Sequence, residues 1–270
     1  MRITFIGGGN MAQALIGGLL ADGTGAADLR VVEPVAAQRE LLQQRYGVES
    51  GAQAGPLVAG SEVVVLAVKP QQMREVCTGL APVLSGQLVV SIAAGIRASD
   101  LSRWLGGHVR IVRCMPNTPA LIGAGLTGLC AMPGLDDADR EAADGLLSAV
   151  GQTLWVDEEA MLDAVTAISG SGPAYVFYFM EAMHTAALGM GFDDEQARAL
   201  TLATFTGAAR LAADSPEPAS VLRERVTSKG GTTAAALAVM AGRGVDRHIV
   251  EALAAARARS QELGDELGRD

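Results

Sequence analysis

The sequence has few of the residues that hold metal ions, disulfide frameworks or membrane spans. Its 270 residues include three cysteines and three histidines, with no paired spacing among them. The pattern therefore predicts neither a metal centre nor a disulfide framework. The longest apolar run, at 88–96, is much too short to cross a bilayer. Aromatic residues are only 4% of the chain, so its core must consist mainly of alanine, leucine, valine and isoleucine.

Positive charge is also scarce. The chain has 21 lysine and arginine residues against 30 aspartate and glutamate residues, a formal net charge of −9. This charge opposes binding to nucleic acid or to an anionic membrane. The N-terminal residues run directly into a strand-and-turn pattern, which leaves no room for a signal peptide. We expect a cytoplasmic protein with a small-molecule partner and no nucleic-acid or membrane partner.

The first half of the chain alternates short β-branched runs with helical segments. Near-continuous apolar strands between helices are typical of a mainly parallel sheet covered on both faces, so residues 1–157 are predicted to form a doubly wound α/β Rossmann domain. The expected strands are 2–6, 29–33, 62–68, 88–93 and 110–114, with weaker ones near 126–131 and 153–157. The expected helices are 10–21, 35–45, 71–79, 99–105 and 136–149.

Beyond residue 157 the strand signal disappears, and residues 158–270 are predicted to form an all-α domain. Pro173 suits a first helical position, and Asp193 is a plausible N-cap. The small, alanine-rich helix faces suggest a dimerisation domain that completes its core against another copy of the chain. The expected helices are 159–168, 173–189, 194–213, 219–226, 233–241 and 245–264.

A glycine-rich turn, FIGGGNMAQA, follows the first expected strand and opens the first expected helix. Gly7, Gly9 and Ala12 fit the dinucleotide-binding fingerprint, in which the glycines permit a tight turn and a close approach of the backbone to a pyrophosphate. The start of the helix, with Asn10 and Met11, presents free N–H groups to those phosphates. The pattern predicts a nucleotide-binding site rather than a purely structural turn.

Two charged residues bear on the choice of nucleotide. Glu33 ends the expected second strand, where an acid hydrogen-bonds the adenosine ribose and favours NAD. Arg39, in the following helix, would instead contact the 2′-phosphate of NADP. Both also fit solvated surface charges. The cofactor therefore stays NADPH or NADH.

Further polar residues follow the later strands, at the sheet edge where open α/β sheets bind ligands. Ala67, Val68, Lys69 and Pro70 end the third expected strand, and Asn117 lies in the loop after the fifth. Asn117 carries an amide that could contact nicotinamide or ribose. The alternative is that Pro70 merely starts a helix and Lys69 lies in solvent. Because three crossovers converge on one crevice, we favour cofactor binding for all of these residues.

Two loops of the second half are unusual. The segment ISGSGPAY places Ser171 between two glycines ahead of a helix, and TSKGGTT, at 227–233, precedes another helix. Read as plain structure, the first is a capped helix entry and the second a bend. TSKGGTT lacks the spacing of a phosphate-binding P-loop.

Together, these segments form a combination of motifs that is specific to one protein family. From FIGGGNMAQA through LAVKPQ, RCMPNTPA, SGSGPAY and TSKGGTT, the whole chain resembles pyrroline-5-carboxylate reductase. The resemblance implies NAD(P)H-dependent reduction of 1-pyrroline-5-carboxylate to L-proline, the last step of proline biosynthesis. It also implies a homodimer that interleaves through the helical domain, sometimes within a larger ring of dimers. The family commonly has proline where this chain has Lys229.

The resemblance also gives roles to the second loop. Successive N–H groups of Gly230, Gly231, Thr232 and Thr233 would hold the substrate carboxylate at a helix start. The hydroxyl of Thr233 would hydrogen-bond the ring nitrogen. Ser171, as a second catalytic candidate, and Ser228 would line the same pocket. A cyclic imine nitrogen is itself basic, so the reaction does not require a strong catalytic acid.

Two other functions stay open at this point. A β-hydroxyacid dehydrogenase also combines a Rossmann and a helical domain, but it needs a lysine in the helical domain. Lys229, the one lysine besides Lys69, lies in an expected turn rather than on a helix face. A non-catalytic nucleotide sensor or scaffold would need no substrate pocket, whereas this chain has two specialised loops beyond the cofactor domain.

Overall fold

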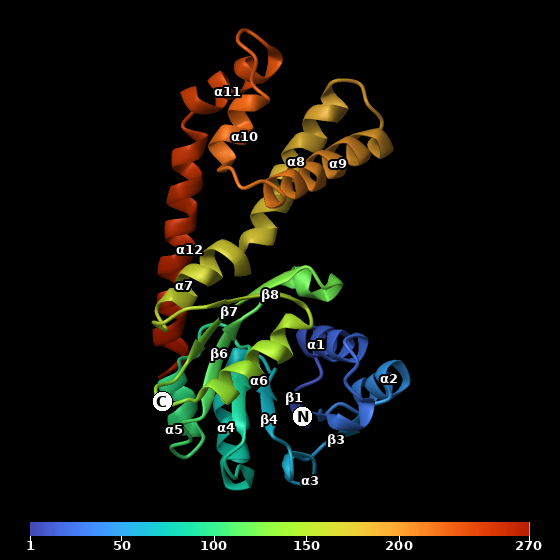
Figure 1. Ribbon diagram of the computed structural model, residues 1–270, viewed down its shortest axis with the longest axis vertical. Coiled ribbons are helices and arrows are strands. Elements are labelled where there is room, and N and C mark those ends of the chain that lie inside the picture. The colour runs from blue at the N-terminus through green and yellow to red at the C-terminus, as the bar shows by residue number, and fades with distance from the viewer. Residues whose placement is uncertain (270) are drawn as a thin grey trace. The chain divides into compact units, whose positions relative to one another are not determined.

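One mainly parallel sheet organises the first half of the computed structural model, which describes residues 1–269 (Figure 1). Its strand order is β3-β2-β1-β4-β5-β6-β7-β8. All neighbours pair in parallel except β6 and β7, which are antiparallel. The strands are β1 (Ile3–Ile6), β2 (Leu29–Val32), β3 (Glu49–Gly51), β4 (Val63–Leu66), β5 (Leu88–Ser91), β6 (Ile111–Met115), β7 (Gly125–Ala131) and β8 (Gly151–Trp155). The predicted Rossmann fold is confirmed.

Helices cover both faces of this sheet, and each face has its own apolar core (Figure 1). Val63 and Val65 of β4 belong to one core and Val64 and Leu66 to the other, as the two-residue period of a strand requires. The α-helices of this region are α1 (Asn10–Ala21), α2 (Ala36–Tyr46), α3 (Ala54–Val58), α4 (Met73–Leu80), α5 (Ala98–Trp104), α6 (Asp137–Ser148) and α7 (Met161–Val165). The expected helices recur here within a few residues, but β3 and α3 were not predicted.

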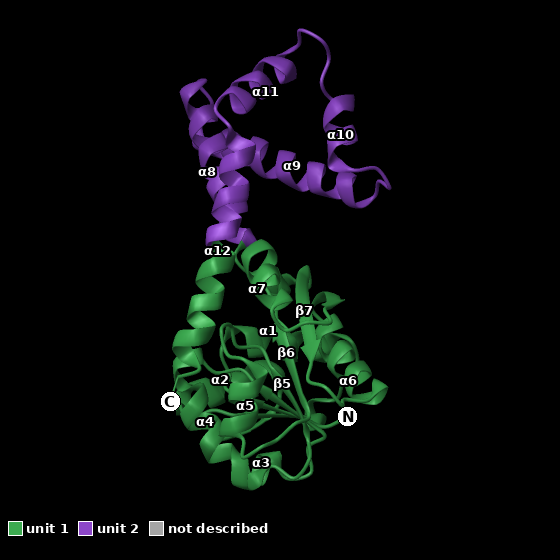
Figure 2. Ribbon diagram, turned by 90° about the vertical axis from the view of Figure 1, so that its left-hand side faces the viewer, with its two compact units in different colours: residues 1–171, 256–270 green, residues 172–255 purple. Residues whose placement is uncertain are grey.

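The chain divides into two compact units (Figure 2). The first unit comprises residues 1–171 and the chain from Ala256 onward, and the second comprises residues 172–255. This division falls after the predicted boundary at residue 157, because α7 packs against the sheet through Leu162 and Val165. It also assigns the two halves of the last helix, α12 (Val245–Leu267), to different units.

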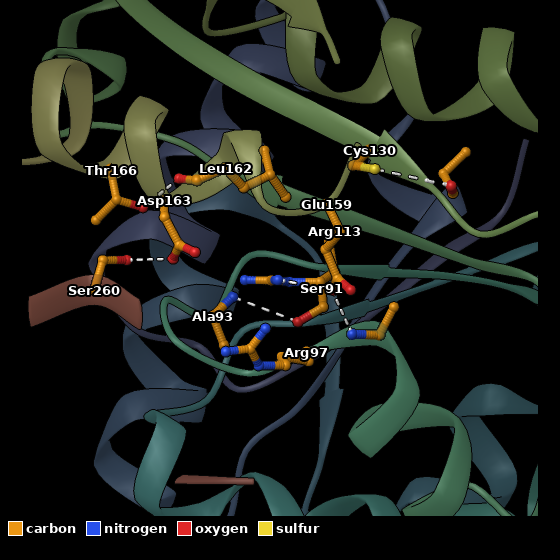
Figure 3. A network of polar contacts seen from close by, with 12 residues as sticks. Ser91, Ala93, Arg97, Arg113, Cys130, Glu159, Leu162, Asp163, Thr166 and Ser260 are labelled. Atoms are coloured by element: carbon orange, nitrogen blue, oxygen red, sulfur yellow. Dashed lines mark hydrogen bonds and ion pairs between the residues drawn. The ribbon is translucent and has the colours of Figure 1, made fainter. Parts of the chain in front are cut away.

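The second half of α12 is held on the first unit by polar contacts (Figure 3). Ser260 Oγ donates to Asp163 Oδ1 at 2.7 Å, as Figure 3 shows. In addition, Arg97 Nη2 donates to Asp265 Oδ1 at 2.6 Å. Leu267 packs against one of the two sheet cores. These contacts fix the end of the helix beside α5 and α7.

An ion pair between buried Arg113 and half-buried Glu159 holds the segment that precedes α7. Arg113 of β6 is only 9% exposed, and its Nη1 lies 2.7 Å from Glu159 Oε1 (Figure 3). The same oxygen accepts a hydrogen bond from the backbone N–H of Ala98 at 2.6 Å. Glu159 therefore ties the segment before α7 to β6 and to the start of α5. A buried cation with such a partner avoids the large cost of an unpaired charge.

The second unit is helical. Its α-helices are α8 (Gly172–Gly189), α9 (Asp194–Ala213), α10 (Ala219–Arg225), α11 (Thr232–Gly242) and the first part of α12. Pro173 lies in the first turn of α8, as expected. Asp193 is the N-cap of α9, where it forms a capping box with Gln196. The predicted run of helices is confirmed.

This helical unit has almost no interior of its own. Of the described residues 172–255, only Ala197 and Thr201 are buried. Consecutive residues Phe177 and Tyr178 of α8 are 57% and 72% exposed, and Met190 is 78% exposed. A helix that is apolar on several faces is normally buried. The unit therefore requires a further apolar surface to cover it.

We predict that a second copy of the chain supplies this surface. In light scattering at micromolar concentration, the protein should have a mass well above the 27.7 kDa of one chain. Replacing Phe177 by Glu should shift the mass towards one chain, because a buried charge is costly. The same charge introduced on the exposed face of α2, by Gln43→Glu, should leave the mass unchanged. A wild-type monomer would contradict the prediction.

Candidate functional site

A crevice lies between β1 and β4, where the strand order of the sheet changes direction. The chain continues from β1 outward to β2 on one side and later returns to β4 on the other. The turn after β1 and the loop after β4 therefore lie side by side at the carboxyl edge, the usual ligand position of such sheets. A cavity of about 650 Å³ lies there. It brings together the predicted residues Gly7, Gly9, Glu33, Ala67, Val68 and Lys69.

Gly7 is required by the fold itself. Its φ is +101°, and a Cβ atom at this position would lie 2.7 Å from the carbonyl oxygen of Ala67. Its N–H donates to the carbonyl of Val32 at 2.8 Å. The turn after β1 is thus packed directly against the end of β4, and a side chain would separate the two.

Gly9 has a different reason to be glycine. Its φ is −69°, which any residue can adopt, and a Cβ atom there would meet nothing within 4 Å. Gly9 is the N-cap of α1, and no side chain caps the free N–H groups of that helix. Open space beside uncapped N–H groups fits a pyrophosphate that approaches the backbone closely. The residues present therefore fit a bound dinucleotide.

The other residues of the fingerprint lie in the first turn of α1. Ala12 is buried, so its small side chain lets α1 lie close to the sheet. Asn10 and Met11 begin α1, and Met11 packs against one of the sheet cores. Within the described chain, these three residues do not line the cavity. Their contact with the cofactor stays a prediction.

Glu33 is held in place by backbone donors. The N–H of Gly8 donates to its Oε2 and the N–H of Val35 to its Oε1, both at 3.0 Å. Arg39 donates from Nη1 to the carbonyl oxygens of Glu33 and Pro34, both at 2.8 Å. Neither residue is the free surface charge that the sequence also allowed. Gly8 was missed as a donor, because no spacing rule links it to Glu33.

The loop after β4 borders the cavity and also begins a short helix. Lys69 is exposed and lines the cavity. Pro70 begins the short 3₁₀-helix Pro70–Gln72. The helix-start interpretation is therefore correct for Pro70, and Lys69 nevertheless faces the crevice.

Asn117 binds protein groups in this structure. Its Nδ2 donates to Ser169 Oγ at 3.0 Å, and its Oδ1 accepts from the N–H of Leu126 at 3.0 Å. The amide thus connects the loop after β6 to β7 and to residues far along the chain. Its contact with nicotinamide or ribose stays a prediction, and no sequence pattern indicated Ser169 as a partner.

Residues 166–170 form a π-helical turn that leads directly to Ser171. The N–H of Ser171 donates to the carbonyl of Thr166 at 2.8 Å. A Cβ atom on Gly170 would lie 2.4 Å from Met115 Cε, so the turn is packed against the end of β6. Such turns often occur at functional sites. The sequence predicted an ordinary helix up to residue 168, since no spacing distinguishes the two forms.

The TSKGGTT loop belongs to the helical unit. Gly230 has a φ of +74°, and a Cβ atom on Gly231 would lie 2.4 Å from Ser228 Oγ. Gly231 is the N-cap of α11, and no side chain caps the N–H groups that follow. Thr232 and Thr233 are the first two residues of this 11-residue helix. An uncapped helix start of this kind favours an anion.

Clusters of metal-binding side chains and helices fit to span a membrane are both absent from the described part of the chain. Residues 1–269 contain no group of three or more histidine, cysteine or acidic side chains arranged to hold a metal ion. None of the helices in that range is long and apolar enough to span a membrane.

The cofactor crevice and the helical unit define a two-domain oxidoreductase that binds a nicotinamide dinucleotide. The family model "NADP oxidoreductase coenzyme F420-dependent" matches residues 2–95. The model "Pyrroline-5-carboxylate reductase dimerisation" matches residues 159–263, which indicates a homo-oligomer.

Similar proteins of known sequence and structure identify the family of this chain. A pyrroline-5-carboxylate reductase from Pseudomonas aeruginosa is 50% identical over 99% of this chain and 98% of its own length. A solved pyrroline-5-carboxylate reductase from Coxiella burnetii is 39% identical, with a TM-score of 0.93 over 97% of this chain and 98% of that one. A solved pyrroline carboxylate reductase from Plasmodium falciparum, with NADP bound, is 28% identical, with a TM-score of 0.87 over 98% of each chain. The chain belongs to the pyrroline-5-carboxylate reductase family.

This membership confirms the resemblance found in the sequence motifs. It also confirms that the chain is an NAD(P)H-dependent oxidoreductase. The β-hydroxyacid dehydrogenase alternative is not favoured, because the reductase relatives match nearly the whole chain.

The two glycines of the fingerprint should respond differently to alanine. Gly9→Ala should leave the midpoint of thermal unfolding within about 2 °C of wild type, since the new methyl group faces open space. It should nevertheless weaken NADH or NADPH binding at least about tenfold, the effect of losing roughly 1.4 kcal/mol. Fluorescence titration of the reduced nucleotide measures the affinity.

Gly7→Ala is the matched comparison. It should lower the free energy of unfolding by about 1–3 kcal/mol from backbone strain alone. Equal unfolding midpoints for the two variants, or unchanged nucleotide affinity in Gly9→Ala, would contradict the assignment.

Proposed function

We propose that the chain reduces 1-pyrroline-5-carboxylate to L-proline with NADH or NADPH, the last step of proline biosynthesis. The observation that carries the proposal is the 50% identity to a reductase of that name over 99% of the chain. The two uncapped helix starts, one in each unit, support it, because the reaction needs an anion site for the cofactor and another for the substrate.

The cofactor crevice has a positioning role in this reaction. When bound, the nicotinamide supplies the hydride. Gly7, Gly9, Ala12 and the first residues of α1, Asn10 and Met11, would hold its pyrophosphate. Glu33 would bind the adenosine ribose. The loop after β4, with Ala67, Val68, Lys69 and Pro70, would form the opposite wall, with Asn117 at its nicotinamide end.

The start of α11 would bind the substrate carboxylate. The uncapped N–H groups of Thr232 and Thr233 lie at the positive end of a helix dipole. Gly230 and Gly231 give the loop before this helix end a tight shape, since Gly230 has a positive φ and a side chain on Gly231 would collide with Ser228. A carboxylate held there fixes the ring relative to the protein, and correct positioning supplies much of the rate in such reactions.

The ring nitrogen needs only a weak partner. A cyclic imine is basic, and its protonated form is already reactive towards hydride. The Thr233 hydroxyl, which can donate or accept a hydrogen bond, would orient the nitrogen. Ser171, held at the end of the π-helical turn, would line the pocket with Ser228. No described residue has to act as a strong acid, which suits the absence of histidine from these loops.

The assembly follows from the helical domain. Residues 1–157 would form the NAD(P)-binding domain and residues 158–270 the substrate-binding and dimerisation domain, a division that the dimerisation match over 159–263 supports. We infer a homodimer through this second domain, which could associate into a ring of dimers. A biosynthetic enzyme of this kind would act in the cytoplasm.

The proposal is tested by following absorbance of the reduced cofactor. Wild-type protein mixed with pyrroline-5-carboxylate should oxidise NADH, NADPH or both, and no oxidation with either nucleotide would overturn the proposed function. Thr233→Val should reduce kcat by about tenfold to a hundredfold, since it removes one hydrogen bond worth roughly 1.5–3 kcal/mol to a charged group. Nucleotide affinity and the unfolding midpoint should change little.

Thr232→Val provides the matched comparison for this variant. It removes a neighbouring hydroxyl that is exposed, but it keeps the backbone N–H at the helix start. Its kcat should therefore fall less than that of Thr233→Val. Identical kinetics for Thr233→Val and wild type would remove the role assigned to the Thr233 hydroxyl.

A further inference from the structure

We propose that Glu33 makes this enzyme bind NADH in preference to NADPH. The proposal rests on the cofactor site described above and adds to it the choice of nucleotide. It concerns one carboxylate at the carboxyl end of β2, next to Val32, on the wall of the crevice that also contains Gly7 and Gly9.

Two backbone donors fix the direction of this carboxylate. The Gly8 N–H binds Oε2 and the Val35 N–H binds Oε1, both at 3.0 Å. A carboxylate offers about four lone-pair sites, so each oxygen can still accept another hydrogen bond. The acid is therefore held beside the glycine turn, on the wall of the cavity, and both of its oxygens keep acceptor capacity for a ligand.

A held acceptor suits one nucleotide and opposes the other. The position after the second strand of a Rossmann fold is where the adenosine ribose lies. The free 2′-hydroxyl of NADH can donate to the carboxylate. The 2′-phosphate of NADPH has no hydroxyl to donate there and carries close to two negative charges, so it would face a like charge that cannot move away.

The surrounding charges do not compensate for this repulsion. Among the described residues that line the cavity, the ionic side chains are Glu33, Glu75 and Lys69. Lys69 follows β4 rather than β2. Arg39, the first basic residue after Glu33 in the sequence, already donates from Nη1 to the carbonyls of Glu33 and Pro34.

A preference for NADH would distinguish this chain from a matching family and a similar protein for which NADP is named. The family model that matches residues 2–95 is described as an NADP oxidoreductase, and the Plasmodium falciparum structure has NADP bound. In this chain, the carboxylate of Glu33 lines the cavity, whereas Arg39 binds the backbone carbonyl of the same residue. Removal of that charge should therefore allow the remaining N–H groups of Arg39 to bind the phosphate.

Direct binding measurements test the proposal without turnover. Fluorescence titration of the wild-type oligomer should give a dissociation constant for NADPH at least about tenfold above that for NADH. Glu33→Gln, which keeps the shape but removes the charge, should lower this ratio by about tenfold or more. Adding Arg39→Ala to Glu33→Gln should then weaken NADPH binding and leave NADH binding nearly unchanged.

Glu40→Gln is the matched control. It removes the same charge from the exposed side of α2, outside the cavity, and should leave the ratio as in wild type. If Glu33→Gln is too unstable to purify, Glu33→Asp, which keeps the charge on a shorter side chain, should retain the preference for NADH.

The outcomes separate this inference from the proposed function. Wild-type protein that binds NADPH as tightly as NADH overturns the inference and leaves the proposed reaction intact. A ratio that Glu33→Gln does not change, or that Glu40→Gln changes equally, overturns the role of Glu33. If neither nucleotide binds wild-type protein, the cofactor site itself is wrong, and the proposed function fails with it.

Discussion

The close packing of the turn after β1 against the end of β4 determines the rest of the cofactor crevice. It depends on the missing side chain of Gly7, whose backbone lies against the carbonyl of Ala67. Because the two loops meet there, the start of α1 opens onto the same space as the end of β2. The uncapped helix end, the held carboxylate of Glu33 and the exposed Lys69 all face that space for this reason.

Much of this crevice could be predicted from the sequence because its causes are local. Strands such as β4 are buried on both faces, so they appear as continuous apolar runs that are easy to place. Glycines at fixed spacing between a strand and a helix directly specify the turn. By contrast, β3 is a three-residue edge strand, Glu49–Gly51, with no apolar signal, and it was missed together with α3.

The parts that were missed depend on contacts between residues far apart in the chain. The hydrogen bond from the Asn117 amide to Ser169, 52 residues away, was not predicted. Arg113 and Glu159 are 46 residues apart and form an ion pair that no local pattern announces. The π-helical turn before Ser171 has an ordinary helical sequence, and in the structure it lies close against Met115.

In the helical unit, the local structure could be predicted from the sequence but the packing could not. Its helices were predicted within a few residues, but its lack of an interior is a property of the folded chain. Alanine-rich helices bury little surface per residue, so a set of them needs a large additional area to become stable. Folding of this unit and assembly of the oligomer are therefore expected to be one process rather than two.

The path of α12 has a consequence for how the chain is connected. Its first half belongs to the helical unit, and from Ala256 onward it belongs to the nucleotide-binding unit, to which residues 1–171 also belong (Figure 2). The helical unit is thus an insertion within the nucleotide-binding unit, tethered at both of its ends. A single break at either tether would leave it attached through the other. After a break before Gly172, the Ser260–Asp163 and Arg97–Asp265 contacts would still hold the two fragments together.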